Sequence, residues 1–145
     1  MKKYIFYIAI IFSLLFIISC KKSRYENYMT YITEGEKTIE FYTVDGIDSL
    51  GYLTDSIIKC KDYYYIFYEN TKSGDPNAVH FFCVNLWTGT GEWDIKKFNT
   101  ILRLRSFSID GYWMDGDWRI VELTKEVIHL KKEGNKIYEL KFVTR

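Results

Sequence analysis

Apolar and polar residues alternate along most of the chain with a period of two. The segment 100–107 places Leu102 and Leu104 on one face, and Arg103 and Arg105 lie on the other. Successive side chains of a β-strand point to opposite faces, so the alternation predicts strands that bury one face. The same pattern predicts eight strands, over residues 38–44, 57–69, 79–87, 92–96, 100–107, 118–123, 127–132 and about 138–142.

Turn residues separate the predicted strands. Asp45-Gly46 ends the first strand, Gly89-Thr90-Gly91 is expected to turn the third into the fourth, and Gly134-Asn135 suits a tight hairpin. Longer loops are expected up to about residue 55 and over 110–116. Connections of these lengths leave no room for crossover helices, so the strands form an antiparallel meander.

A meander of eight strands removes its exposed edges by closing on itself. We therefore predict an all-β fold, an eight-stranded antiparallel up-and-down barrel, with a β-sandwich as the second choice. Such a barrel is either filled by side chains or holds one small ligand. The expected inward residues are Phe41 or Tyr42, Trp93, Leu102, Leu104, Trp118, Ile120, Tyr138, Leu140 and Phe142.

One segment follows a helical period instead. Its apolar positions are Tyr25, Tyr28, Met29 and Ile32. Ser23 and Glu26 form a capping box at its start, and Gly35 can adopt the left-handed conformation that ends a helix. We expect one short helix over about 24–33, whose apolar stripe covers one end of the sheet or barrel.

The first 19 residues have the features of a secretory signal. Lys2 and Lys3 precede an apolar run of about 15 residues, which is short of the roughly 20 that a spanning helix needs. The small residue Ser19 then precedes Cys20. A signal anchor that stays in the membrane is the alternative.

Cys20 follows the small residue as in a bacterial lipobox, which the segment resembles. In that family the thiol receives a diacylglycerol and the chain is cut before the cysteine. The resemblance implies a signal peptide over 1–19, lipidated Cys20 with a tether over 20–23, and one domain over 24–145. Lys21 is not the aspartate that marks inner-membrane retention in enteric bacteria, which favours an exported protein held by its acyl anchor in the outer membrane.

Composition narrows the class of partner. Without residues 1–19 the chain has 126 residues, with 18 basic against 19 acidic side chains. A near-neutral balance argues against nucleic acid, because a phosphate backbone requires a basic surface. The 13 Tyr, 10 Phe and 4 Trp favour half-buried, pleated surfaces and support the β prediction.

Two further cysteines, Cys60 and Cys83, would lie in an oxidising compartment, where a pair usually forms a disulfide. Two separate buried thiols are the alternative. Simple hairpin register pairs Cys83 with Tyr64, so the disulfide requires a bulge or a slipped register.

Several short segments together resemble the small lipocalin-like lipoproteins common in Bacteroidota. They are residues 39–50, 91–94, 100–104, 118–124, 128–130 and 137–142. The resemblance implies a calycin-type barrel on a lipid anchor, and it implies no known ligand. Lipocalins proper carry a Gly-x-Trp on the first strand, whereas here that pattern occurs at Gly91-Glu92-Trp93 in mid-chain.

The sequence contains no recognisable catalytic or metal-binding motif. His80 and His129 fall on separate strands without ligand spacing. Asp110, Asp115 and Asp117 lie close together in the sequence, but without the register of a calcium loop, and Asp-Gly pairs are ordinary in turns. We expect no enzyme activity, no cofactor and no metal.

Large aromatic residues are the candidate ligand-binding groups, with burial in the core as the alternative. They are Trp93, Trp113, Trp118 and Tyr138. Two functions stay open. A hollow barrel would bind a small apolar or amphipathic ligand, whereas a filled barrel would offer its surface to an envelope protein or glycan.

Overall fold

The computed structural model describes residues 7, 25–53, 63–70, 75–83, 86–96, 100–105 and 114–145, with the backbone alone at 52, 53 and 86–88. A helix runs over residues 25–33. The elements that follow are β1 (Lys37–Val44), β2 (Ile47–Asp48), α2 (Leu50–Leu53), β3 (Tyr63–Tyr68), β4 (Asn77–Cys83), β5 (Leu86–Lys96), β6 (Ile101–Arg105), β7 (Gly116–Leu123), β8 (Val127–Glu133) and β9 (Ile137–Thr144).

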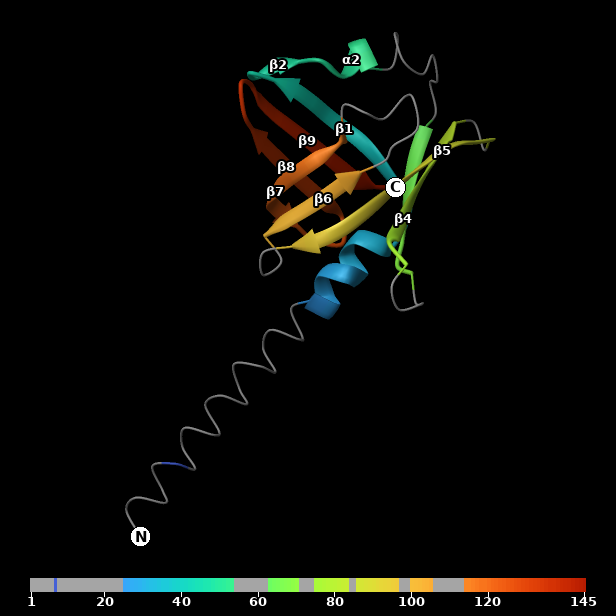
Figure 1. Ribbon diagram of the computed structural model, residues 1–145. Helices are drawn as coiled ribbons and strands as arrows, with labels where there is room; N and C mark the ends of the chain where they lie inside the picture. The colour runs from blue at the N-terminus through green and yellow to red at the C-terminus, as the bar shows by residue number, and fades with distance from the viewer. Residues whose placement is uncertain are drawn as a thin grey trace.

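The strands form one antiparallel sheet that closes into a barrel (Figure 1). Their order is β2-β1-β3-β4-β5-β6-β7-β8-β9, and β1 also pairs with β9 along most of its length. The barrel therefore has eight strands, with the short β2 attached to the edge of β1. The predicted all-β, up-and-down barrel is confirmed, and the β-sandwich is not the fold. Between β1 and β3 the register consists of the pair Lys37–Tyr65.

The predicted N-terminal helix is present and covers one end of the barrel, as expected (Figure 1). Its Met29 and Ile32 are 4% and 0% exposed and belong to the same buried cluster as the barrel residues. The helix ends before Gly35, whose φ of +77° suits a glycine. The apolar stripe of the helix thus closes the end at which β1 begins and β9 ends.

The interior consists largely of the residues that the alternation predicted. Buried side chains include Tyr42, Trp93, Leu102, Leu104, Trp118, Leu140 and Phe142, while Ile120 and Tyr138 are partly buried against them. The choice between Phe41 and Tyr42 is decided by a register shift between Ile39 and Phe41. This bulge changes the inward phase of β1, so Ile39 and Tyr42 are both buried.

The predicted turn at Gly89-Thr90-Gly91 is wrong. These residues lie within the continuous strand β5, and the preceding strand β4 ends at Cys83 instead of Trp87. Both glycines are buried, and Gly89 pairs with Phe81 beside a register shift. Glycine within a strand often marks a bulge or a close approach, and Gly89 lies beside such a register shift.

Two further expectations need correction. The β3–β4 register pairs Cys83 with Tyr63, and Tyr64 pairs with Phe82, so the predicted register was wrong by one residue. The expected loop up to residue 55 contains β2 and α2. Asp48, at the end of β2, accepts a 2.9 Å hydrogen bond through its side chain from the amide of Leu50, the first residue of α2.

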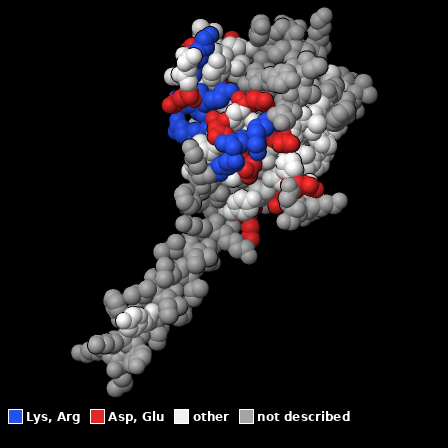
Figure 2. All heavy atoms as spheres, viewed as in Figure 1, with Lys and Arg blue, Asp and Glu red and all other residues white. Residues whose placement is uncertain are grey.

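Charged side chains of both signs are interleaved on one side of the barrel wall (Figure 2). They include the ion pairs Arg103–Asp117, Arg119–Glu133 and Lys131–Glu139. Along these strands, charged side chains that face outward alternate with apolar side chains that face the interior. This is the period-two pattern of the sequence.

Candidate functional site

Strand β8 carries a lysine on its inward face. Ile128 and Leu130 are 1% and 0% exposed, and Lys132 continues the same face two residues later. Lys132 lies toward the end of the barrel opposite the helix, where β8 turns into β9. It is half-buried, so an ammonium group is enclosed within the barrel end.

Two aromatic rings and one carbonyl surround the Lys132 ammonium. Its Nζ lies 4.5 Å from the ring centre of Trp118 and 5.1 Å from that of Tyr138. It also donates a 3.0 Å hydrogen bond to the carbonyl oxygen of Asp115. Burial lowers the pKa of Lys132, and the nearby negative charge of Asp115 raises it in part. The faces of aromatic rings attract a cation.

Gly116 lies beside the lysine stem. Its φ is +132°, and a Cβ at this position would lie 3.4 Å from Cδ of Lys132. A side chain here would therefore be held at a strained positive φ, while its Cβ would make an ordinary van der Waals contact with Lys132.

A second tyrosine extends the aromatic surface. Tyr42 of β1 stacks on Tyr138 of β9, with ring centres 6.5 Å apart and planes at 24°. Burial raises the pKa of Tyr42, and Tyr138 adds to this shift. The pairing of β1 with β9 brings these rings together, because Tyr42 lies opposite Leu140 and Val44 lies opposite Tyr138.

The rim of this barrel end carries two exposed apolar residues, Ile47 and Ile137, among polar turn residues. The amide of Asp45 donates a 2.7 Å hydrogen bond to the carbonyl of Ile137, and the amide of Ile137 donates to the Asp45 carboxylate at 2.8 Å. These bonds tie the β1–β2 turn to β9. Ile137, at the start of β9, is 44% exposed, and Ile47, in the β1–β2 hairpin, is 71% exposed. We call Lys132, Trp118, Tyr138, Tyr42 and this rim the mouth cluster.

The predicted ligand residues separate into two groups. Trp118 and Tyr138 meet at Lys132, whereas Trp93 lies away from this lysine. Both indoles are buried and donate to backbone carbonyls, that of Trp93 to Tyr68 and Ala78 at 3.1 and 3.0 Å and that of Trp118 to Met114 at 2.6 Å. The predicted Trp113 lies outside the described residues. Lys132 was missed, although the inward phase of β8 was the signal that could have found it.

The predicted cysteine sites are tested only in part. Cys83 is disulfide-bonded. Its predicted partner Cys60 and the predicted lipidation site Cys20 lie outside the described residues, so the pairing and the lipid anchor stay predictions.

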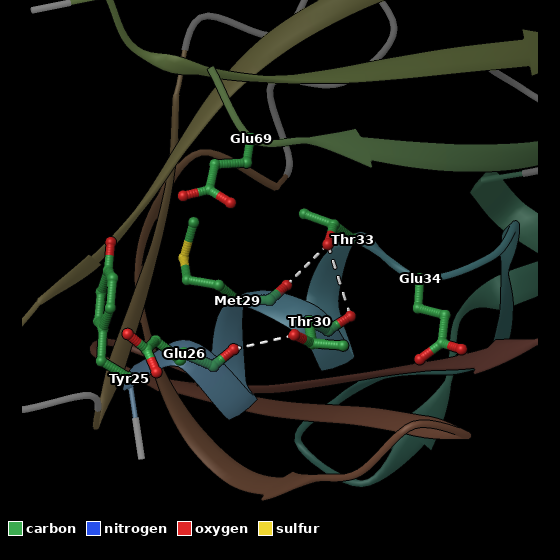
Figure 3. Close-up of a pocket in the computed structure, with 7 residues that line it drawn as sticks. All are labelled: Tyr25, Glu26, Met29, Thr30, Thr33, Glu34 and Glu69. Carbon is green, nitrogen blue, oxygen red and sulfur yellow. Dashed lines mark hydrogen bonds between the residues drawn. The ribbon is translucent and has the colours of Figure 1, made fainter. Parts of the chain in front are cut away.

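A hollow of about 290 Å³ lies between the N-terminal helix and the end of β3 (Figure 3). Its lining residues are Tyr25, Glu26, Met29, Thr30, Thr33, Glu34 and Glu69. Thr30 and Thr33 donate to carbonyls of their own helix, and Glu34 pairs with Lys125 at 3.4 Å. Burial raises the pKa of Tyr25, with smaller effects from Glu69 and Asp94. The hollow is acidic, but the hydroxyls of Thr30 and Thr33 are already hydrogen-bonded to carbonyls of their own helix.

The outer wall of β3–β4 is largely aromatic, and the guanidinium carbon of Arg145 lies 4.3 Å from the ring centre of Tyr64. Tyr64 stacks on Phe82 with ring centres 5.0 Å apart, and Tyr68 lies 4.8 Å from the ring of His80. Tyr68 and His80 also line a shallow hollow of about 260 Å³. Tyr68 is 43% exposed, so this aromatic wall is available to a partner.

The two histidines lie on different strands. His80 is on β4 beside Tyr68, and His129 is on β8, 3.8 Å from Glu139. Within the described ranges, no three His, Cys, Asp or Glu side chains are grouped to hold a metal ion. None of the helices in this part of the chain has both the length and the hydropathy that crossing a membrane requires.

A comparison of the chain with protein families, with curated proteins and with solved structures finds no match. The closed eight-stranded barrel is itself compatible with a lipocalin-like fold.

Proposed function

We propose that this protein is a non-catalytic, lipid-anchored lipoprotein of the bacterial envelope, which binds one small amphipathic ligand at the mouth cluster. The lipobox-like segment ending at Cys20 and the resemblance to lipocalin-like lipoproteins of Bacteroidota support an exported protein in the outer membrane. The closed barrel supports the binding role, because eight strands can enclose one small ligand.

The observation that carries the proposal is the half-buried Lys132 between Trp118 and Tyr138. The inward positions of a filled barrel are mostly apolar, and the other buried lysine, Lys37, is held by hydrogen bonds to Glu34 and Thr144. Burying an ammonium costs free energy, and polar groups placed in an apolar site are typical of ligand binding. The other inward positions of β8 are occupied by apolar residues, Ile128 and Leu130.

The mouth cluster offers both surfaces that an amphipathic molecule requires. The half-buried ring of Tyr138, on which the buried Tyr42 stacks, and the exposed side chain of Ile47 suit an apolar chain. Lys132 provides the polar contact at the inner end. The ligand would therefore lie with its apolar part along the rim and its polar end near the ammonium.

Photocrosslinking tests this arrangement on the full-length chain in phosphatidylcholine nanodiscs. Diazirine derivatives of palmitic acid and of hexadecanol would be crosslinked, and the modified peptides mapped by mass spectrometry. We expect crosslinks in peptides that contain Tyr42, Trp118 or Tyr138, and excess unlabelled ligand should suppress them. Crosslinks that resist competition, or that fall outside these peptides, would reject the proposed binding role.

The aromatic wall of β3–β4 favours a second function, a filled-barrel lipoprotein that binds an envelope protein or a glycan. Tyr68 and His80 form the exposed part of this wall. If this function holds, Tyr68→Ala abolishes binding of the partner, whereas Val121→Ala, which changes an exposed residue of β7, leaves it intact.

A further inference from the structure

The proposed acyl anchor attaches to the chain close to the N-terminal helix. Tyr25, the first residue of the helix that the structure describes, lies five positions after Cys20. A fully extended chain spans about 3.5 Å per residue, so Tyr25 stays within roughly 18 Å of the anchored residue. The anchor therefore keeps the start of the helix close to the surface of the bilayer.

The helix and the mouth cluster lie at opposite ends of the barrel (Figure 1). Glu69, directly after β3, lines a hollow together with the helix (Figure 3), and we call the helix and Glu69 the helix end. Strand β1 extends for eight residues from this end toward the mouth. That length corresponds to roughly 23 Å along the strand, or about 18 Å along the axis of a barrel with the usual strand tilt. An anchor beside the helix thus leaves the mouth on the far side of the barrel.

The helix end carries aromatic side chains that suit the headgroup layer of a membrane. Tyr25 is 41% exposed, and Tyr28 and Tyr31 follow it at intervals of three residues as half-buried side chains. Residues at this spacing are neighbours on the helix surface. Tyrosine is enriched at membrane–water interfaces, because its ring is apolar and its hydroxyl forms hydrogen bonds. These tyrosines favour contact with lipid headgroups.

The charges near the helix end are consistent with a phospholipid partner. Three ion pairs lie at this end of the barrel, Lys96–Asp94, Lys125–Glu34 and Arg145–Glu36. Between the anchor and the helix the sequence is basic, with Lys21, Lys22 and Arg24. Phosphate groups at a membrane surface attract such a segment. The basic tether and the tyrosines therefore favour the same partner.

We infer that the helix end rests on the phospholipid headgroups of the bilayer that holds the acyl anchor, and that the mouth cluster opens away from this bilayer. The inference rests on the lipid anchor of the proposed function. It adds the surface that meets the membrane and the direction from which a ligand enters. A ligand reaches the mouth from the aqueous side, without passing through the bilayer that carries the protein.

Site-specific photocrosslinking to lipid tests this orientation. The acylated chain, expressed from the full-length sequence, is placed in phosphatidylcholine nanodiscs. The photoreactive residue p-benzoylphenylalanine replaces one exposed residue at a time, in two matched pairs that each sample both ends. In the first pair, Tyr25 and Ile137 are 41% and 44% exposed, and the second pair is Glu69 and Ile47. Two pairs are used so that the comparison does not depend on the folding of one variant.

Intact-mass spectrometry after irradiation measures the fraction of chains that carry one added phospholipid. We expect this fraction to be roughly fivefold or more higher for Tyr25 than for Ile137, because the barrel is longer than the interfacial layer of a bilayer is thick. The fraction for Glu69 should likewise exceed that for Ile47. Equal fractions at the two ends, or a higher fraction at the mouth, would overturn the orientation. If none of the four positions forms an adduct, the barrel stands clear of the bilayer and the docking surface is rejected.

The mass of the purified chain separates this inference from the proposed function. A chain without attached acyl groups removes the lipid anchor, and the inference fails with it. An acylated chain with equal adducts at both ends keeps the anchor and rejects only the orientation.

Discussion

The ammonium of Lys37 donates a 2.6 Å hydrogen bond to Oγ1 of Thr144, which joins the first residue of β1 to the last residue of β9. It also donates to the carbonyl of Glu34, just after the helix, at 2.6 Å, and to that of Lys125 at 3.4 Å. Lys37 is 0% exposed. One buried cation thus connects the helix, the closure of the barrel and the β7–β8 turn, and its charge suits the C-terminal end of the helix.

Lys37→Met should lower the free energy of unfolding by about 1.5–3 kcal/mol, the range for hydrogen bonds to a charged group. The methionine retains the stem but leaves the carbonyls of Glu34 and Lys125 without this donor. Chemical denaturation of the full-length chain in mild detergent measures the change. Lys125→Met, at an exposed ion pair, should change stability by less than about 1 kcal/mol. Equal stability of both variants would show that removing the buried charge compensates for the lost bonds.

Gly35→Ala should destabilise the fold by about 1–3 kcal/mol, because a non-glycine residue would be held at positive φ. The added Cβ would also lie 2.7 Å from Cγ2 of Thr144. Gly134→Ala is the matched control, since nothing lies within 4 Å of a Cβ at that position, and it should have an effect within about 0.5 kcal/mol. Thermal melting of both variants measures the difference in stability. Similar melting temperatures for the two variants would contradict the close approach of the end of the helix to β9.

Stability should fall as the pH rises above 10, and Tyr65 should contribute to this loss. Burial raises the pKa of Tyr65 far above its ordinary value of 10.0, and Tyr63 adds to the shift. Above pH 10 the unfolded chain loses the phenol proton while the folded chain keeps it, which costs about 1.4 kcal/mol of stability per pH unit for one group. The free energy of unfolding, measured between pH 9 and 11, should therefore fall less steeply with pH for Tyr65→Phe than for the unaltered chain. An unchanged slope would mean that Tyr65 ionises as readily in the folded chain.

The disulfide of Cys83 should be to Cys60 in the exported protein. Mass spectrometry of peptides prepared without reductant identifies the pair. Cys83→Ala should lower stability by about 2–4 kcal/mol, as is typical of a lost disulfide. Cys60→Ala should cost the same amount, because either substitution removes the same bond. A crosslinked peptide that contains Cys20 instead would reject both the pairing and the lipid anchor.

Cys20→Ser should abolish incorporation of labelled palmitate and leave an uncleaved precursor in cells. Only the thiol of Cys20 follows the apolar run and a small residue. Cys83→Ser, expressed in parallel, should be labelled as the unaltered chain is. Labelling that survives Cys20→Ser would remove the basis for the lipoprotein assignment.

The alternation of side chains predicted the barrel because most inward positions are locally visible. Leu102 and Leu104 are both 0% exposed, as their spacing indicates. The alternation no longer predicts which side chains point inward where a bulge inserts a residue, as between Ile39 and Phe41. A bulge depends on how two strands meet, so one strand's sequence does not reveal it.

Glycine-containing motifs predicted one turn correctly and another wrongly. Gly134 and Asn135 lie between β8 and β9 as predicted, but Gly89 and Gly91 lie inside β5. Glycine suits a turn and equally suits a strand that approaches a neighbouring ring closely. The aromatic Phe81 opposite Gly89 belongs to another strand, and that pairing determines which use applies.

The sequence by itself determined the fold class, the number of barrel strands, the short helix and most of the core, because these depend on periodicities within a few residues. The tertiary structure decided what the lysines do. Lys37 and Lys132 look like ordinary polar positions in the sequence, yet one closes the barrel and the other lies between two rings. Their partners Thr144, Trp118 and Tyr138 come from other strands, and only closure of the sheet brings them within reach.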